Sequence, residues 1–79
     1  MQILYFAWVR EALGKGEEIV DPPAGVVTVS DLLDWLGHEV FADRAKLRAA
    51  VDQQFVPLDT PIAGAKEVAI FPPVTGGSR

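Results

Sequence analysis

The chain of 79 residues contains no cysteine and a single histidine, His38. The lack of cysteine excludes disulfide bonds, thiolate metal sites and a cysteine nucleophile, and a single histidine excludes a cluster of histidine ligands. Stability must therefore come from the packing of apolar side chains, which make up 49% of the sequence. A chain of this length forms one domain that buries about 60–65% of the surface exposed by its unfolded form.

The sequence also lacks an excess of positive charge and a long apolar segment. Its formal net charge is −4 and its lysines and arginines are scattered, whereas nucleic-acid binding needs a basic face. The apolar run from Ile3 to Val9 is too short to cross a bilayer, and no basic segment precedes it as in a signal peptide. We therefore expect a cytoplasmic protein that binds neither nucleic acid nor a membrane.

Runs of apolar, β-branched and aromatic residues bounded by glycine and proline predict the strands. The predicted strands are residues 2–9, 17–21, 47–52 and 67–71, with a helical turn at 10–14 and a short extended piece at 55–57. One further segment, 29–36, has the pattern of an amphipathic helix, with an apolar stripe at Val29, Leu32, Leu33 and Leu36.

The ends of this predicted helix carry their own signals. Thr28 and Asp31 have the spacing of a capping box, and Gly37 is a suitable residue for the helix end. We expect the leucines to pack on one face of the sheet, against Ile3, Tyr5, Val51, Val68 and Ile70.

The order strand, strand, helix, strand, short strand, strand predicts an α+β domain whose mixed sheet carries one main helix across one face. The first and last strands can lie side by side at its centre, which is the β-grasp, or ubiquitin-like, arrangement. Another α+β layout of the same elements is also compatible with the pattern. The domain is expected to span residues 1–73, followed by a flexible C-terminal arm at 74–79, where two glycines increase backbone freedom.

No set of side chains in the sequence predicts catalysis or a metal site. His38 follows the helix without an apparent nucleophile or orienting carboxylate, and is interpreted as a surface histidine. Asp31 and Asp34 flank the leucine stripe and are interpreted as its solvated side. The glycines at 14 and 16 and the GAK at 64–66 do not complete a phosphate-binding loop.

The predicted first strand has more apolar residues than one helix can cover. Phe6 and Trp8 share the parity of Gln2, which marks their side of the strand as the uncovered face, and Phe71 lies on the last strand. An exposed apolar patch of this kind indicates a protein interface. The alternative is that the loop at 53–63 folds over the patch and hides it.

The ending FPPVTGGSR, residues 71–79, combines a stiff segment with two glycines. A Gly-Gly segment can pass through a channel too narrow for other residues, and a carboxyl group on glycine is unhindered. Pro72 and Pro73 favour an extended exit from the last strand and lower the entropy lost on docking. The composition alone fits a frayed end equally well.

The stretches ILYFAWVREALG, LRAAVDQQFV and EVAIFPPVTGG resemble the small, sulfur-carrier subunits of molybdopterin synthase, over essentially the whole chain from Met1 to Gly77. The most specific part is the combination of VRE after the first strand with FPPVTGG. The resemblance implies a role in molybdenum cofactor biosynthesis. The terminal glycine carboxylate would be adenylated by a partner adenylyltransferase that uses ATP, and then converted to a thiocarboxylate. The large catalytic subunit would take up the tail, within a heterotetramer, and pass the sulfur to a cyclic pterin precursor.

For individual residues, the resemblance implies that Gly77 carries the sulfur and that Gly76 gives passage. The expected partner-binding residues are apolar or belong to the arm: Phe6, Phe55, Phe71, Pro72, Pro73, Val74 and Thr75. The catalytic groups would belong to the partners, so the chain would bind no cofactor and would not be catalytic alone.

The sequence departs from the family pattern at three places. Asp52 stands where asparagine is common, Ala65-Lys66 replaces a frequent Gly-Asp, and Ser78-Arg79 follow the glycine that should be terminal. While these two residues remain, the carbonyl of Gly77 is part of an amide and cannot be adenylated. Two alternatives stay open: a sulfur carrier of the thiamine pathway, and a ubiquitin-like binding or modifier domain that carries no sulfur.

Overall fold

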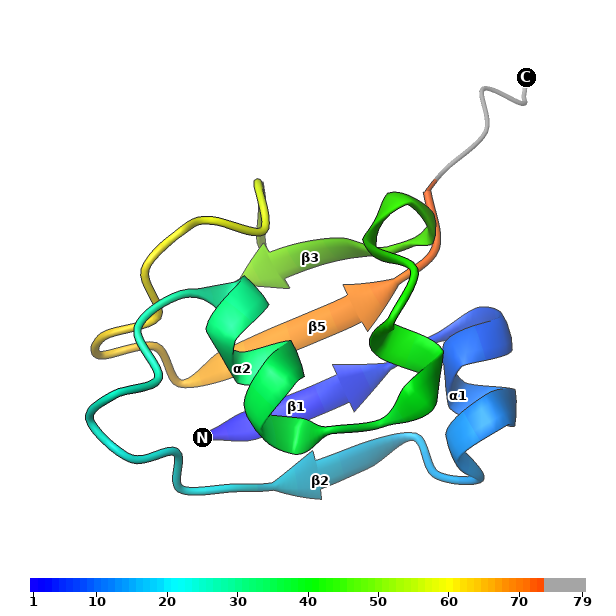
Figure 1. The fold of residues 1–79 in the computed structure, drawn as a ribbon, viewed down its shortest axis with the longest axis horizontal. Helices are drawn as coiled ribbons and strands as arrows, with labels where there is room; N and C mark the ends of the chain where they lie inside the picture. Colours follow the sequence, from blue (N-terminus) through cyan, green and yellow to red (C-terminus); the bar gives the residue numbers. More distant parts are fainter. Residues whose placement is uncertain (74–79) are drawn as a thin grey trace.

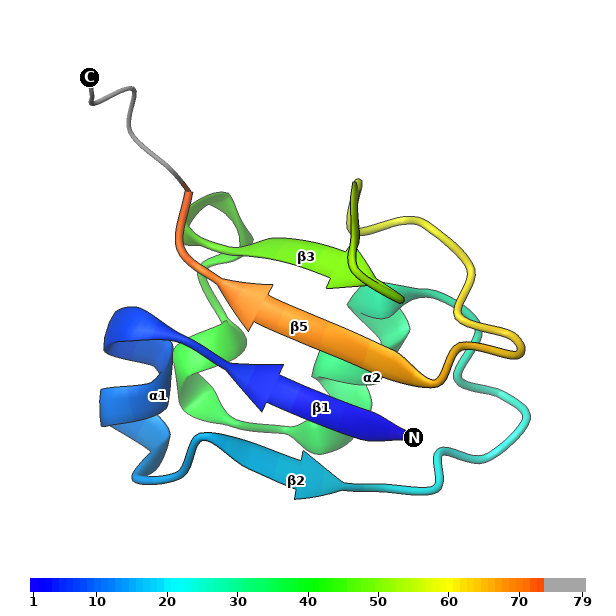
Figure 2. The ribbon, with the colours of Figure 1, turned by 180° about the vertical axis from the view of Figure 1, so that it is seen from behind.

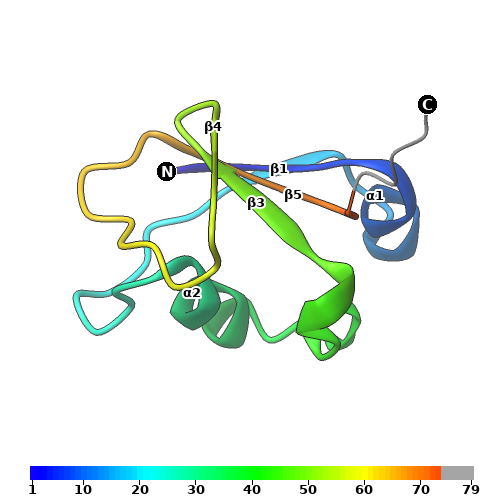
Figure 3. The same cartoon turned by 90° about the horizontal axis from the view of Figure 1, so that it is seen from above.

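The computed structural model describes residues 1–73. Its elements are β1 (Gln2–Tyr5), α1 (Ala7–Leu13), β2 (Glu17–Ile19), α2 (Val29–Leu36), two 3₁₀ turns (Glu39–Phe41 and Arg44–Lys46), β3 (Arg48–Val51), β4 (Gln54–Val56) and β5 (Glu67–Phe71). The strands form one mixed sheet in the order β2-β1-β5-β3-β4; Figure 1 shows the first four of these side by side, and β4 is labelled in Figure 3. β1 pairs in parallel with β5, and the other pairs are antiparallel. The predicted β-grasp fold, with the first and last strands side by side, is confirmed.

Helix α2 lies across one face of the sheet, as the view from above shows (Figure 3). Its start is fixed by the predicted capping box: the amide of Asp31 donates to Thr28 Oγ1 at 3.1 Å, and the amide of Thr28 donates to Asp31 Oδ2 at 3.2 Å. Its end is fixed by Gly37, whose φ of 71° is the left-handed conformation that glycine adopts without strain. These local signals place the leucine stripe toward the sheet.

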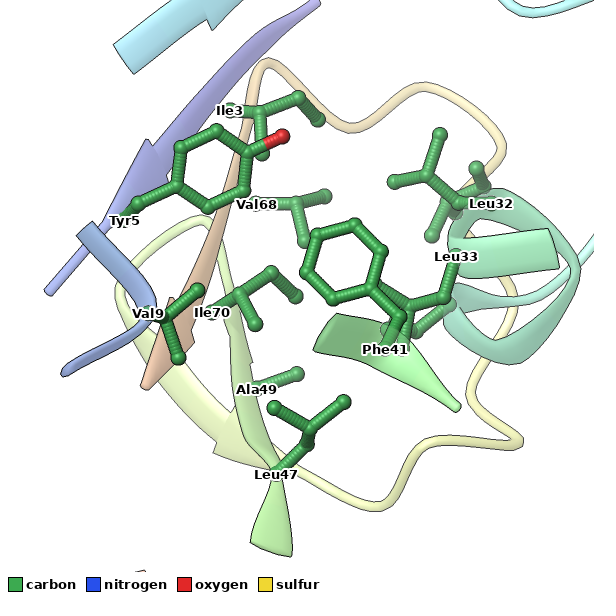
Figure 4. Close-up of a cluster of buried hydrophobic side chains, with 12 residues drawn as sticks. Ile3, Tyr5, Val9, Leu32, Leu33, Phe41, Leu47, Ala49, Val68 and Ile70 are labelled. Atoms are coloured by element: carbon green, nitrogen blue, oxygen red, sulfur yellow. The ribbon is translucent and has the colours of Figure 1, made fainter. Parts of the chain in front are cut away.

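The hydrophobic core fills the space between α2 and the sheet (Figure 4). Leu32 and Leu33 of the helix are completely or almost completely buried, and Leu36 packs at the edge of the cluster. The sheet and the turns contribute Ile3, Tyr5, Phe41, Leu47, Ala49, Val68 and Ile70. Each large aliphatic side chain buried in this way stabilises the fold by about 1.5–3 kcal/mol, which explains how a domain without disulfides is held together.

The prediction of a strand over residues 2–9 is wrong beyond Tyr5, whereas the helical turn predicted at 10–14 is the second half of a longer helix that Gly14 ends, as expected. β1 ends at Tyr5, and residues Ala7–Leu13 form helix α1. Val9 is completely buried, and Leu13, four residues later, packs against the same core, which is the spacing of a helix. The apolar run is so short that its pattern also fits a strand, and the sequence prediction therefore extended the strand too far. Gly14 ends the helix with a φ of 73°. Within residues 1–73, no helix is long and apolar enough to cross a bilayer.

Candidate docking surface at the exit of the last strand

The face of the sheet opposite α2, here called the open face, is shown in Figure 2, where no helix of residues 1–73 lies in front of the central strands. Its centre is a row of small or aliphatic residues in register: Leu4 on β1, Ala69 on β5 and Ala50 on β3. Ala50 and Ala69 are almost fully buried although no helix covers them.

An aromatic pair, Phe55 and Phe71, lies on the open face beside these alanines. Phe55 on β4 is opposite Ala50 in register, and its ring centroid lies 5.2 Å from that of Phe71 at the end of β5. Phe55 is 78% exposed, so the pair presents a large apolar surface to solvent. The two rings line a groove of about 410 Å³, here called the aromatic groove, together with Arg48, Ala49, Val56 and Pro57. An apolar groove with an exposed aromatic side chain is typical of a protein interface.

The chain leaves the sheet beside this groove. Phe71 is the last residue of β5, and Pro72 and Pro73 follow it, half-buried. The amide of Phe6 donates to the carbonyl of Ile70 at 3.2 Å, so the start of α1 lies at the same end of β5 (Figures 1 and 2). Phe6 is 47% exposed. The structure therefore gathers the described members of the predicted partner-binding set at the point where β5 ends.

The remaining members of that set, Val74 and Thr75, lie outside the described residues, as do Gly76 and Gly77, the predicted passage and carrier residues. The expectation of a flexible arm at 74–79 also falls there and stays a prediction.

Trp8 is not on the open face, contrary to the expectation from alternation. It belongs to α1 and packs, partly buried, against the hydrophobic core. The physical reason is the early end of β1, because a residue that leaves the strand no longer follows its two-residue period. Phe6 likewise precedes α1 rather than extending β1, although it stays exposed.

The loop that could have hidden the apolar patch packs elsewhere. The amides of Val29 and Ser30 donate to the carbonyls of Thr60 and Leu58 at 3.0 and 2.8 Å, and the amide of Ile62 donates to the carbonyl of Val27 at 2.9 Å. These bonds tie the loop to the N-terminal end of α2. The loop therefore leaves Phe6 exposed, and of the segment 53–63 the side chain that contacts Phe71 is the exposed ring of Phe55, which enlarges the apolar surface.

A polar cluster on the other side of the sheet was not predicted. The hydroxyl of Tyr5 donates to Glu18, whose carboxylate also lies 3.1 Å from Lys15 Nζ and 3.6 Å from His38 Nε2. Burial raises the pKa of the Tyr5 phenol, and the hydrogen bond and charge of Glu18 raise it further. Burial also raises the pKa of Glu18, but the hydrogen bonds from Tyr5 and Lys15 and the charges of Lys15 and His38 outweigh it and hold that pKa below its usual range.

This cluster joins β1, β2 and the turn after α2, and its members satisfy one another. The sequence could not indicate it because Glu18 and His38 are far apart along the chain, and only the fold brings them together. Among the described residues, no group of three or more histidine, aspartate or glutamate side chains could hold a metal ion. The contacts of the cluster connect β1, β2 and the turn after α2.

Comparison with protein families and curated proteins identifies related chains. The model of the ThiS family matches residues 3–77. The molybdopterin synthase sulfur carrier subunit of Escherichia coli (strain K12) is 37% identical, over 98% of this chain and 99% of the relative. The subunit of the same name from Haemophilus influenzae is 32% identical over 98% and 99%, and that from Dictyostelium discoideum is 33% identical over 96% and 94%.

Two solved structures share the fold. SAMP1 from Haloferax volcanii superposes with a TM-score of 0.71 at 29% identity, covering 96% of this chain and 97% of that one. A protein described as molybdopterin converting factor, subunit 1, from Pyrococcus furiosus superposes with a TM-score of 0.72 at 29% identity, covering 92% and 95%. By sequence and by fold, the chain belongs to the ThiS family and to its group of molybdopterin synthase sulfur carrier subunits.

Proposed function

We propose that this chain is the sulfur carrier subunit of a molybdopterin synthase and that Gly77 is the residue that carries the sulfur. The observation that carries the proposal is the continuity of the FPPVTGG segment with β5, whose last residue, Phe71, lines the aromatic groove. The names of the curated relatives support the same function. The names of these relatives favour the molybdopterin synthase subunit over the two alternatives, a sulfur carrier of the thiamine pathway and a modifier domain that carries no sulfur.

The chemistry of the carrier begins with an unreactive group. A carboxylate is a poor electrophile because neither of its oxygens can leave. Attack of a Gly77 carboxylate oxygen on the α-phosphorus of ATP, with loss of pyrophosphate, would give an acyl-adenylate from which AMP can leave. Hydrosulfide then attacks the carbonyl carbon and displaces AMP, and loss of the proton from sulfur gives the thiocarboxylate. The partner adenylyltransferase would supply the ATP site for the adenylation.

The chain itself contributes binding and positioning. The open face would dock on the large catalytic subunit, in a heterotetramer with two copies of each chain, and Pro72 and Pro73 would direct the arm toward that subunit's active site. Gly76 and Gly77 have no side chains to obstruct a narrow channel. The thiocarboxylate would then transfer its sulfur to a cyclic pterin precursor, in the cytoplasm.

The test compares two versions of the chain. A version that ends at Gly77 is mixed with the adenylyltransferase of its own organism, ATP and a sulfide source, and its intact mass is measured. We expect first an AMP adduct and then replacement of one oxygen by sulfur. The 79-residue chain is the matched control: it should not react, because Ser78 holds the Gly77 carbonyl in a peptide bond. Thiocarboxylation of a chain that still carries Ser78 and Arg79 would overturn the assignment of Gly77.

A further inference from the structure

We propose that Arg48 is a specificity residue of the docking surface, and that it binds a carboxylate side chain of the large subunit next to an apolar side chain that enters the aromatic groove. The proposal rests on the proposed function, since it names the chemistry of the partner at that surface. It concerns a residue that neither the sequence patterns nor the apolar docking set indicated.

The position of Arg48 follows from the register of the sheet. Arg48 begins β3 and is the partner of Phe71 across the β3–β5 ladder. Because paired residues of neighbouring strands point to the same face, its side chain lies on the open face, beside the aromatic groove that it helps to line. The cation therefore sits at the rim of the apolar surface, next to the exit of the arm.

The guanidinium of Arg48 is oriented by the backbone but is not neutralised. Its Nη1 donates to the carbonyl of Leu47 at 2.7 Å and to that of Ala45 at 3.3 Å. Within residues 1–73, these two carbonyls are its only hydrogen-bond acceptors, and no carboxylate lies within ion-pair distance. The other N–H donors of a planar guanidinium are thus held in a fixed direction and remain available to an external acceptor.

Three other cations of the described residues are paired with carboxylates, whereas Arg10 and Lys66, like Arg48, have no ion pair there but do not line the aromatic groove. Arg44 pairs with Asp34, Lys15 with Glu18 and Lys46 with Asp43. The chain as a whole has a net charge of −4, yet none of the residues that line the aromatic groove is acidic. A local positive charge beside an apolar groove is complementary to a partner segment that carries both an apolar side chain and an aspartate or glutamate.

The two parts of the surface have different tasks. The rings of Phe55 and Phe71 provide the desolvated area from which most of the affinity of an interface comes. The pair between Arg48 and the partner's carboxylate, at the rim, selects partners that have the acid and rejects those that present a cation there. Arg48 would therefore affect affinity in a salt-dependent way, and the phenylalanines in a way that salt changes little.

The experiment measures binding of the chain ending at Gly77 to the large subunit of its own organism, by titration calorimetry at low and high salt. We expect Arg48→Gln to weaken binding about tenfold at low salt and less at high salt. Arg48→Lys should recover part of the loss, because it keeps the charge without the planar fork. The matched control is Lys66→Gln, which removes an exposed cation at the opposite end of β5 and should leave the affinity unchanged. Circular dichroism checks that each variant is folded.

A charge exchange supplies the second arm. Arg48→Glu should bind poorly to the large subunit and recover when one acidic residue of that subunit is changed to arginine. Equal affinities of Arg48→Gln and the unaltered chain at low salt, with Phe71→Glu still failing to bind, would overturn the role of Arg48 and leave the carrier function intact. Self-association of the free chain through this groove, lost in Arg48→Gln, would also overturn it, since a second copy would then be the occupant. Failure of the unaltered chain to bind the large subunit at all would overturn both proposals.

Discussion

Asp52 and Glu67 are joined across the sheet by a hydrogen bond in which the amide of Glu67 donates to Asp52 Oδ1 at 3.0 Å, and the amide of Lys66 donates to the same oxygen at 2.9 Å. Asp52 and Gln53 form the two-residue turn between β3 and β4, with φ values of 49° and 71°. One side-chain oxygen therefore fixes the start of β5 to the tip of this hairpin. The departure from asparagine at position 52 keeps this function, because both side chains offer the same acceptor.

The first prediction concerns this acceptor. Asp52→Asn should change the free energy of unfolding little, because the amide oxygen can accept both bonds and asparagine tolerates a positive φ. Asp52→Ala should destabilise the domain by about 1–2 kcal/mol, because two exposed hydrogen bonds are lost and because alanine is strained at a positive φ, where aspartate and asparagine are tolerated. Urea denaturation monitored by circular dichroism measures both. Equal stabilities of the two variants would show that Oδ1 contributes nothing.

The second prediction concerns the core under α2. Leu33→Ala should lower the free energy of unfolding by about 2–5 kcal/mol, because it removes a buried side chain and leaves a cavity between the helix and the sheet. Trp35→Ala is the comparison within the same helix, since Trp35 is 42% exposed and should cost less. Denaturant melting of the two variants measures the difference. A smaller loss for Leu33→Ala than for Trp35→Ala would contradict the orientation of α2.

The third prediction concerns Glu18 and acid. The pKa of its carboxyl is lower in the folded chain than in the unfolded chain, so the contribution of the ionised group is present above the unfolded pKa and is lost as pH falls through the folded pKa. Glu18→Gln should therefore be less stable than the unaltered chain at neutral pH, and the difference should shrink on acidification. Denaturation curves from neutral pH into the acid range provide the measurement. A difference that does not depend on pH would mean that the charge of Glu18 is not involved.

The fourth prediction concerns docking. Phe71→Glu should keep the circular dichroism spectrum and lose binding to the large subunit, because it places a charge in the centre of an apolar interface that is bare in the free chain. Val27→Glu is the matched control: Val27 is also exposed, but it lies in the loop before α2, away from the open face. Titration calorimetry distinguishes the two. Unchanged affinity of Phe71→Glu would assign docking to another face.

The sequence predicted those parts of the fold that depend on local patterns. The capping box of Thr28 and Asp31 and the leucine stripe identify α2 within a single segment of chain. The order of elements is compatible with β1 beside β5 but also with another α+β layout, and the observed β1–β5 pairing decides between them. The boundary at Phe6 failed because the run YFAWV fits both a strand and a buried helix at this length. Only the burial of Val9 in the folded core decides between them.

The sequence predicted which apolar residues belong to the candidate docking surface, but not how they contact one another. Phe55 and Phe71 are apolar residues that the resemblance indicated, yet their contact depends on the register of β3 with both β4 and β5. Arg48 was missed because a lone arginine at the start of a strand has no spacing that marks it. Arg48 is notable because it lies beside Phe71 and lines the aromatic groove. These neighbours come together only when the sheet folds.

The central place of β5 has a consequence for how the protein is made. β5 is the last of the five described strands along the chain, but it lies between β1 and β3, so this sheet cannot assemble around its middle until the residues through Phe71 have been synthesised. A product terminated before Glu67 would lack the central strand of the sheet. We expect such a product to stay unfolded and open to proteolysis, so that it would not compete for a partner of the full chain.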